Sequence, residues 1–458
     1  MDIKQLIEQG RHSEASSAIE AHEEMTIDLL LLRILNENEQ LNLDVALELI
    51  AEASKIPTSN DIVPMQLLAH KIFVYVWKTE FPKALELISE FEFETKFVKP
   101  DEHNQLASAL AAVSGLKGRV YGYFNFEGKA KEGITILQDT IVLCEAIDDR
   151  YLLATSHTTL SSIYFFSEEY EAANNHLLMS LKLFKLIGNK LHIARVLNNL
   201  GNLMTGLGNF EAAKNYLDDA HQTVHSIEED FFFKWGLNSE IVLSTIFLQL
   251  TLDDYDAAKE IFGSIQLENL DMQNPLSSIR YKLSKALILK YNPRLYYKMQ
   301  SYPIFIDIVE NYYETDVEYV IQATIELCDL LIDELSLYGN PEVLTELNDL
   351  INTLHRQAES RSSVQIIIQA LIMKSKIALI TTSVDKAIGY LEYGRDLAIK
   401  NNLDPMIVVV EKELENLNKQ YEKWSDIINS NASLTEKLQR SDFQRYIQDA
   451  LRVKKQTA

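Results

Sequence analysis

The spacing closest to a metal-binding motif is that of His221 and His225, which lie four residues apart on one expected helix. Residues at positions i and i+4 share a helix face, so both imidazoles can approach one ion. Glu228 and Glu229 follow, but no third ligand stands at a spacing typical of a known zinc motif. We therefore expect a solvated histidine pair near a helix end and no metal site.

Residues that could act as a nucleophile, an acid or a base have ordinary structural interpretations. Cys144 follows an apolar pair and Cys328 lies in an apolar stripe, so both thiols are expected in a packed core. The run Asp101-Glu102-His103 is typical of a helix start, where acidic residues stabilise the positive end of the helix dipole. The sequence has no glycine-rich phosphate loop, Gly-x-Ser-x-Gly elbow or His-Glu-x-x-His motif. We predict no enzyme activity, no metal and no cofactor.

The composition favours long helices over strands. The 458 residues include 15 Gly and 9 Pro, too few for the turns that a strand-rich fold of this length needs. The two cysteines lie far apart, which excludes a disulfide framework, and no apolar run approaches about 18 residues. The N-terminal residues lack the pattern of a signal peptide, which is a basic start followed by an apolar segment. We therefore expect a cytoplasmic protein without a membrane span.

The charge is strongly negative and unevenly distributed. A net charge of −24 opposes binding to nucleic acid and to anionic membranes. Residues 301–350 carry twelve acidic residues and no Lys or Arg, whereas residues 433–458 carry six basic and three acidic residues. The acidic stretch is either solvated helix surface or a docking face for a basic partner or for the basic tail of another copy.

The basic tail itself has an apolar stripe that needs covering. It is expected to form a last amphipathic helix, which either caps the end of the fold or mediates a homo-oligomer. The stripe consists of Leu434, Leu438, Ile447 and Leu451.

A repeat of about 40 residues runs through the chain. Placing residues 151–190 over 191–230 aligns Ala173 with Ala213 and Leu177 with Leu217, each pair following an aromatic residue. Two antiparallel helices approach closely where one presents Gly, Ala or Ser, and the large residue that follows fills the space towards the next hairpin. The pattern recurs at Gly133–Leu137–Thr140, Ala46–Ile50–Ala53, Ala84–Ile88–Phe91, Ala258–Phe262–Ile265 and Ala387–Leu391–Gly394, and a half-repeat opens the chain at Gly10, Ala15 and Ile19.

These residues resemble the tetratricopeptide repeat, most closely at residues 197–201 (LNNLG) and 208–213 (GNFEAA). The period is longer than the usual one of about 34 residues and is similar to the longer-helix variants of kinesin light chains and bacterial peptide-sensing regulators. Residues 285–290 and 326–335 look like those of archaeal tetratricopeptide proteins. The resemblance covers nearly the whole chain. It implies an all-α, right-handed superhelical solenoid of antiparallel helix hairpins.

The resemblance also indicates a binding face, because the first helix of each tetratricopeptide hairpin lines a concave surface. Asn is a poor residue for a helix interior, since its amide competes with the backbone. An amide also offers a donor and an acceptor that can pair with the backbone of an extended peptide. Peptide contact and hydrogen bonding on the helix surface or between repeats both remain open. The residues at the concave positions are Thr155, Thr158, Thr159 and Ser162 in one repeat and Arg195, Asn198, Asn199 and Asn202 in the next.

The carboxylate clamp of chaperone-binding tetratricopeptide proteins is incomplete in either register. In one register Thr158 and Ser162 stand where Lys and Asn are required. Starting one repeat earlier supplies Arg195 and Asn199 but places glycines at the other clamp positions.

Proline placement suggests the division of the chain. No proline occurs between Asp101 and Asn274, whereas Pro293 is expected to end one helix and Pro303 to begin the next, which runs from Ile304 to about Leu337. A further helix is expected from after Pro405 to about Asn429. We predict tetratricopeptide-like repeats over 1–100 and regular repeats over 101–274. A divergent acidic unit over 275–360, a further repeat over 361–430 and a basic capping helix over 431–458 follow.

Stacked hairpins expose a long surface that suits an extended ligand, so we expect a non-catalytic scaffold or adaptor that binds a peptide or protein segment, possibly a basic one. A second hypothesis is a peptide-responsive regulatory sensor that controls another protein. A third is a cryptic hydrolase-like regulator that uses a carboxylate in the groove.

Overall fold

The computed structural model describes residues 2–22, 24–97, 104–123, 129–166, 169–228, 232–265, 275–312, 317–338, 340–360, 364–381, 383–401, 403–419, 421, 425–427 and 436. These residues form helices and no strand. An all-α solenoid of helix hairpins is therefore confirmed as the fold class. The expected helix over residues 434–453 and the run Asp101-Glu102-His103 lie outside the described residues.

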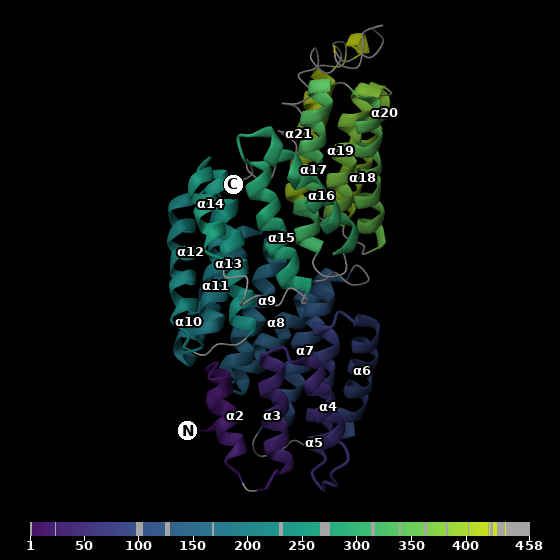
Figure 1. The fold of residues 1–458 in the computed structure, drawn as a ribbon. Coiled ribbons are helices and arrows are strands. Elements are labelled where there is room, and N and C mark those ends of the chain that lie inside the picture. The colour runs from purple at the N-terminus through teal and green to yellow at the C-terminus, as the bar shows by residue number, and fades with distance from the viewer. Residues whose placement is uncertain are drawn as a thin grey trace. The chain divides into compact units, whose positions relative to one another are not determined.

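The helices follow one another along the chain (Figure 1). In chain order they are α1 (Ile3–Glu8), α2 (His12–Glu20), α3 (Ile27–Glu39), α4 (Leu43–Ala53), α5 (Ile62–Trp77), α6 (Phe81–Glu94), the short 3-10 helix η1 (Thr95–Phe97), α7 (Gln105–Gly122), α8 (Ala130–Ala146), α9 (Arg150–Phe166), α10 (Tyr170–Ile187), α11 (Lys190–Gly206), α12 (Phe210–His225), α13 (Phe232–Thr251), α14 (Tyr255–Gly263), α15 (Pro275–Lys290), α16 (Leu295–Asn311), α17 (Val317–Tyr338), α18 (Pro341–Ser360), α19 (Val364–Thr381), α20 (Val384–Lys400) and α21 (Asp404–Lys419).

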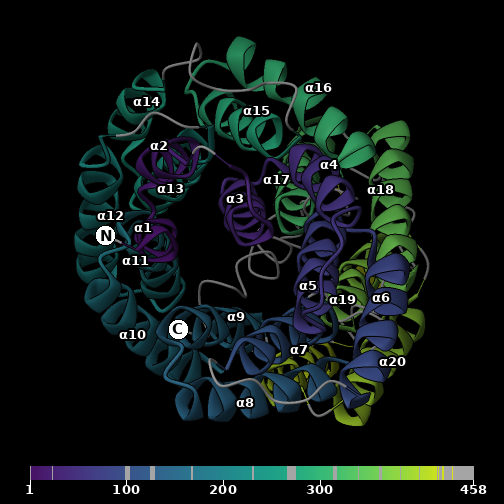
Figure 2. The same ribbon diagram turned by 90° about the horizontal axis from the view of Figure 1, so that it is seen from below.

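The chain divides into two compact units, each described by itself. Among the described residues, one unit contains 2–205 and 210–245, and the other contains 206–209, 246–265 and those from 275 onwards. In the first unit, α7, α9 and α11 form the inner layer of a curved double layer and α8, α10 and α12 form the outer layer (Figure 2). Helices α1 and α2 lie on the inner side of this curve in the view of Figure 2, and the end of α1 contacts Asn189 at the start of α11.

The small residues of the repeat lie where the sequence pattern predicted them. The alanines at the first small position of the pattern have no exposed surface, because each is covered by its hairpin partner. The large residues that follow are buried as well in most repeats, as Leu137 and Leu217 illustrate, whereas Phe262 is only half-buried. The fully buried alanines are Ala46, Ala84, Ala173, Ala213, Ala258 and Ala387.

The tightest hairpin contact joins α7 to α8 through two glycines. A Cβ added at Gly133 would lie 2.2 Å from the backbone nitrogen of Gly122, a distance that no side chain tolerates. In the next hairpins, a Cβ at Gly201 of α11 would lie 2.6 Å from Cγ of Leu217 on α12. These positions fix how closely the inner and outer helices approach.

Two local predictions were wrong. Gly10 is not a hairpin contact of the repeat: it has a φ of +75° and forms the turn between α1 and α2, while Ala15 and Ile19 are buried as predicted. Pro303 does not begin a helix but lies inside α16, which already starts at Leu295, and the single helix expected from Ile304 to about Leu337 is divided between α16 and α17. The exposed side chain of Pro303 and the single lost backbone donor are tolerated in α16 because apolar neighbours such as Phe305 anchor the helix.

Two glycines of α11 provide a matched test of the hairpin contacts. Gly201→Ala should destabilise the protein by roughly 1–3 kcal/mol, because the new methyl group overlaps Leu217. Gly206→Ala, where no atom lies within 4 Å of the added Cβ, should be neutral or stabilise it by up to about 1 kcal/mol. Urea denaturation followed by circular dichroism measures both, and equal free energies of unfolding would contradict the assigned contact.

Candidate functional site

The predicted binding residues lie on two neighbouring inner helices of the first unit. Thr155, Thr158, Thr159 and Ser162 belong to α9, and Arg195, Asn198, Asn199 and Asn202 belong to α11. Asn199 and Asn202 are three residues apart and therefore share one face of α11.

The hydroxyl groups of α9 are already hydrogen-bonded within their own helix. The Oγ1 atoms of Thr155 and Thr159 donate to backbone carbonyls at 3.0 Å, and Ser162 Oγ donates to a carbonyl at 3.2 Å. Thr158 Oγ1 also lies 2.7 Å from Oγ of Ser180 on α10, so this side chain faces the hairpin partner. A ligand at α9 would have to compete with these bonds.

The three asparagines of α11 have different environments. Asn198 has no exposed surface, and its Nδ2 donates to Oε1 of Glu240 on α13 at 3.2 Å. Its Oδ1 has no hydrogen-bond partner among the described residues. Asn198 thus connects α11 to α13, which is the inter-repeat role that the sequence left open.

Asn199 and Asn202 are half-buried, and their side chains make no hydrogen bond with any described residue. Neither amide is among the buried side-chain atoms without a hydrogen-bond partner, so both reach solvent and are available to a ligand. Arg195 lies one turn before Asn199 and is also half-buried. Burial lowers the pKa of Arg119 on α7, and repulsion from the positive charge of Arg195 lowers it further. The two guanidinium groups are therefore close enough to interact.

A largely enclosed cluster of three half-buried polar residues adjoins this face and was not predicted. The hydroxyl of Tyr151 at the start of α9 donates to Oε2 of Glu39, the last residue of α3, and lies 3.0 Å from Nε2 of His192 on α11. The His192 ring stacks on Phe184 with centroids 4.5 Å apart. Burial raises the pKa of Glu39, but the hydrogen bonds from His192 and Tyr151 outweigh it and hold that pKa below its ordinary value. Burial lowers the pKa of His192. The three residues come from distant segments of the chain, so no local sequence motif could have predicted that they lie together.

The N-terminal helices are also tied to the start of α11. Nδ2 of Asn189 donates to the backbone carbonyl of Glu8 at 2.8 Å, and Oδ1 of Asn189 accepts from the backbone N–H of His192 at 3.0 Å. Through these two hydrogen bonds the buried Asn189 both caps the N-terminus of α11 and attaches the end of α1 to it.

The cysteines and histidines that were considered for catalysis or metal binding lie in environments typical of structural residues. Cys144 and Cys328 are buried, and burial raises the pKa of each thiol to about 12, so neither is a thiolate at neutral pH. The rings of His221 and His225 lie 4.1 Å apart, and His225 Nδ1 lies 2.9 Å from the carbonyl oxygen of His221. No group of three or more potential metal ligands occurs within the described ranges.

Part of the acidic stretch at 301–350 is neutralised inside the second unit. Nζ of Lys290 on α15 lies 2.5 Å from Glu326 and 2.7 Å from Asp329 of α17. Lys298 and Lys282 pair with Asp333 and Asp307 in the same way, each at 2.5 Å. These four acidic residues are structural, which reduces the charge available for docking a basic partner.

Comparisons with known proteins identify no family for the chain. No protein-family model and no curated protein matches it. Among solved structures it is similar to a Rap protein complexed with Competence and Sporulation Factor, at 15% identity and a TM-score of 0.44, over 92% of this chain and 96% of that chain. It is also similar to the apo form of RapI, at 15% identity and a TM-score of 0.45, over 78% and 94% of the two chains. The third is BtubC (BKLC) from P. vanneervenii, at 14% identity and a TM-score of 0.37, over 52% and 89%. At these values the similarities assign neither a family nor a ligand.

A search of the described helices for one long and apolar enough to cross a membrane finds none.

Removal of the buried lysine should be costly in the second unit. Lys290→Ala leaves Glu326 and Asp329 without their cation, and we expect a loss of roughly 3–5 kcal/mol in the free energy of unfolding. The triple variant Lys290→Met, Glu326→Gln and Asp329→Asn should recover much of this loss, because no buried charge remains. Thermal denaturation compares the two, and a triple variant less stable than Lys290→Ala would contradict the ion-pair assignment.

The lowered pKa of His70 leads us to predict that the stability of the protein depends on pH. Asn38 Nδ2 lies 3.1 Å from Nδ1 of His70 on α5, and burial lowers the pKa of His70 to about 4. The unfolded chain, with a histidine pKa of about 6.5, binds more protons between these values, so stability falls as pH falls through about 6.5. His70 alone should account for a loss of about 2 kcal/mol between pH 7.5 and pH 5.

Urea denaturation at the two pH values measures this loss in the wild type and in His70→Gln, which cannot titrate. The variant should lose about 2 kcal/mol less than the wild type on acidification. Identical losses in the two proteins would remove His70 from the explanation.

Proposed function

We propose that this protein is a non-catalytic scaffold or adaptor that binds an extended segment of a partner protein along α9 and α11. The observation that carries the proposal is the pair Asn199 and Asn202, whose half-buried amides share one helix face and have no partner among the described residues. Each amide can donate to a carbonyl and accept from an N–H of an extended peptide, so the binding does not depend on the peptide's side chains.

The remaining predicted residues take supporting roles in this proposal. Arg195 offers a positive charge one turn away from the two amides and suits a carboxylate of the bound segment. Thr155 and Ser162 of the neighbouring α9 are half-buried and extend the proposed contact surface, whereas Thr159 is buried. Asn198, which precedes Asn199, holds α11 to α13.

The proposal includes a reducing, cytoplasmic setting. Both cysteines are free and buried, and nothing in the composition favours a disulfide-stabilised extracellular protein. A basic partner remains compatible with the net charge of −24, which would accelerate the encounter. Self-association through the C-terminal segment stays a prediction.

A peptide-responsive sensor is the second candidate function. The hydrogen bond from Asn198 to Glu240 joins α11 to α13 at the residue that precedes Asn199 of the proposed site. A ligand that displaces α11 would therefore change its relation to α13, which is the kind of differential contact a sensor requires.

Panning of a random peptide library displayed on phage tests the binding site and does not require the natural partner. Peptides selected on the wild type should bind Asn199→Ala/Asn202→Ala about tenfold more weakly or worse, because each lost amide removes one or two hydrogen bonds. The double variant should be at least as stable as the wild type, since Ala is the better helix former.

A matched control removes two amides from the outer layer. Asn174→Ala/Asn175→Ala on α10 should leave the affinity unchanged. Asn198→Ala, which loses the bond to Glu240, should instead cost about 1 kcal/mol of stability. Equal affinities for the wild type and the α11 double variant would remove Asn199 and Asn202 from the site.

A further inference from the structure

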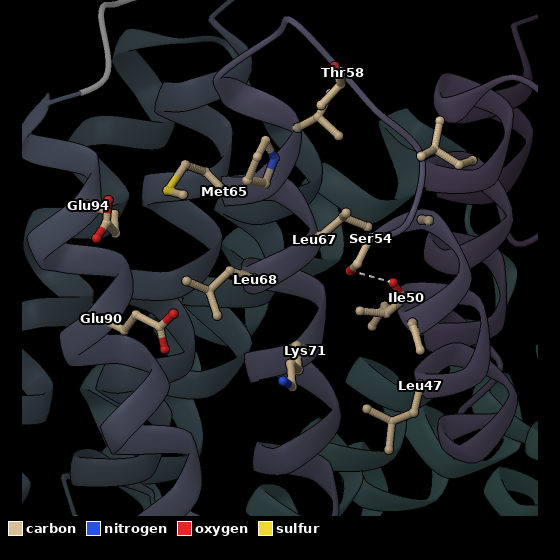
Figure 3. A pocket seen from close by; sticks show the side chains of 15 residues that line it. Leu47, Ile50, Ser54, Thr58, Met65, Leu67, Leu68, Lys71, Glu90 and Glu94 are labelled. Atoms are coloured by element: carbon tan, nitrogen blue, oxygen red, sulfur yellow. Dashed lines mark hydrogen bonds between the residues drawn. The ribbon is translucent and has the colours of Figure 1, made fainter.

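A second surface in the first unit lies between α4 and α6, with α5 as its floor. The groove has a volume of about 360 Å³, within the range of small binding clefts. Leu47 and Ile50 of α4 face Glu90 and Glu94 of α6 across it, with Leu68 of α5 between them (Figure 3). The floor and one wall are therefore mainly apolar, apart from Lys71 of α5 and Ser54 after α4, and the other wall is acidic.

The acidic wall differs from the rest of α6 in how its charges are paired. Glu86 pairs with Lys83 at 2.8 Å, and Glu92 pairs with Lys117 at 2.7 Å. Glu90 makes no ion pair with any residue that the structure describes, and the same holds for Glu94. The two unpaired carboxylates are the ones that line the groove.

Their spacing makes this arrangement unfavourable in the free protein. Glu90 and Glu94 are four residues apart, so their like charges are neighbours on one helix face and repel each other. A cation placed between them would remove the repulsion and gain attraction. The one basic residue lining the groove, Lys71 of α5, makes no ion pair with either carboxylate.

The apolar floor sets the shape of the partner. Met65 and Leu68 stand three residues apart on α5 and line the groove together (Figure 3). Grooves of this kind between helices accept the apolar face of an amphipathic helix, whose side chains repeat at three and four residues. The charged wall then selects helices with basic residues along the edge that faces α6.

We propose that the groove between α4 and α6 is a docking site for an amphipathic helix of a partner protein that carries Lys or Arg along one edge. The apolar face of that helix packs mainly on the half-buried Leu47 and Leu68, since Ile50 and Met65 are largely covered, and its basic edge pairs with Glu90 and Glu94. This site is separate from the amides of α11 and does not depend on them.

Two designed helical peptides of equal length test the proposal on the full-length chain. They share one leucine face and differ in the flanking edge, which is lysine in one peptide and glutamate in the other. Fluorescence anisotropy should detect binding of the lysine peptide and not of the glutamate peptide. Glu90→Gln/Glu94→Gln should weaken binding about fivefold, as expected for two exposed ion pairs.

A matched variant separates this site from general attraction to an acidic protein. Glu342→Gln/Glu346→Gln on α18 removes the same charge from another pair four residues apart and should leave the affinity unchanged. Hydrogen exchange with the lysine peptide bound should protect residues 47–54, 64–71 and 86–94. Absence of binding, equal binding of both peptides, equal weakening by the two double variants, or protection confined to other helices would each overturn the proposal.

Discussion

The structure depends on the close approach of paired helices at small residues. The backbones of Gly122 and Gly133 meet with no room for a Cβ, and the buried alanines of the other hairpins allow a similar approach. Close contact brings each outer helix against one face of its inner helix and leaves the opposite face of the inner helix free for other neighbours. The polar residues of α9 and α11 therefore acquire different environments according to the face on which they lie.

This division of faces explains why so few of the predicted binding residues are available. Thr158 lies towards the outer helix and reaches Ser180 of α10. Asn198 lies towards the next inner helix and reaches Glu240 of α13. Asn199 and Asn202 occupy the remaining face and have no described partner, which is the reason the proposed function rests on them. The same logic applies to α6, where the glutamates that face the groove are the unpaired ones.

The sequence predicted the helical repeat well because the rule behind it is local. A small residue followed four positions later by a large one indicates a hairpin contact, and Ala213 with Leu217 has the predicted burial. Helix boundaries near prolines were less predictable, as Pro303 inside α16 illustrates, because packing of neighbours overrides a single lost hydrogen bond. Contacts between distant segments were beyond local patterns. The bond between Tyr151 and Glu39 and the burial of Lys290 between Glu326 and Asp329 depend on how the helices pack, and residue spacing does not encode them.

The central claim is that an extended peptide binds on the face of α11 that carries Asn199 and Asn202. Photo-crosslinking tests it most directly: a selected peptide carrying a photoreactive residue is irradiated with the full-length protein, and mass spectrometry maps the adducts. The account predicts adducts on α11 within one helical turn of Asn199 or Asn202, with further adducts on α9. It also predicts that both are lost when unlabelled peptide competes. Adducts confined to the outer helices α8, α10 and α12, or to the second unit, would contradict it.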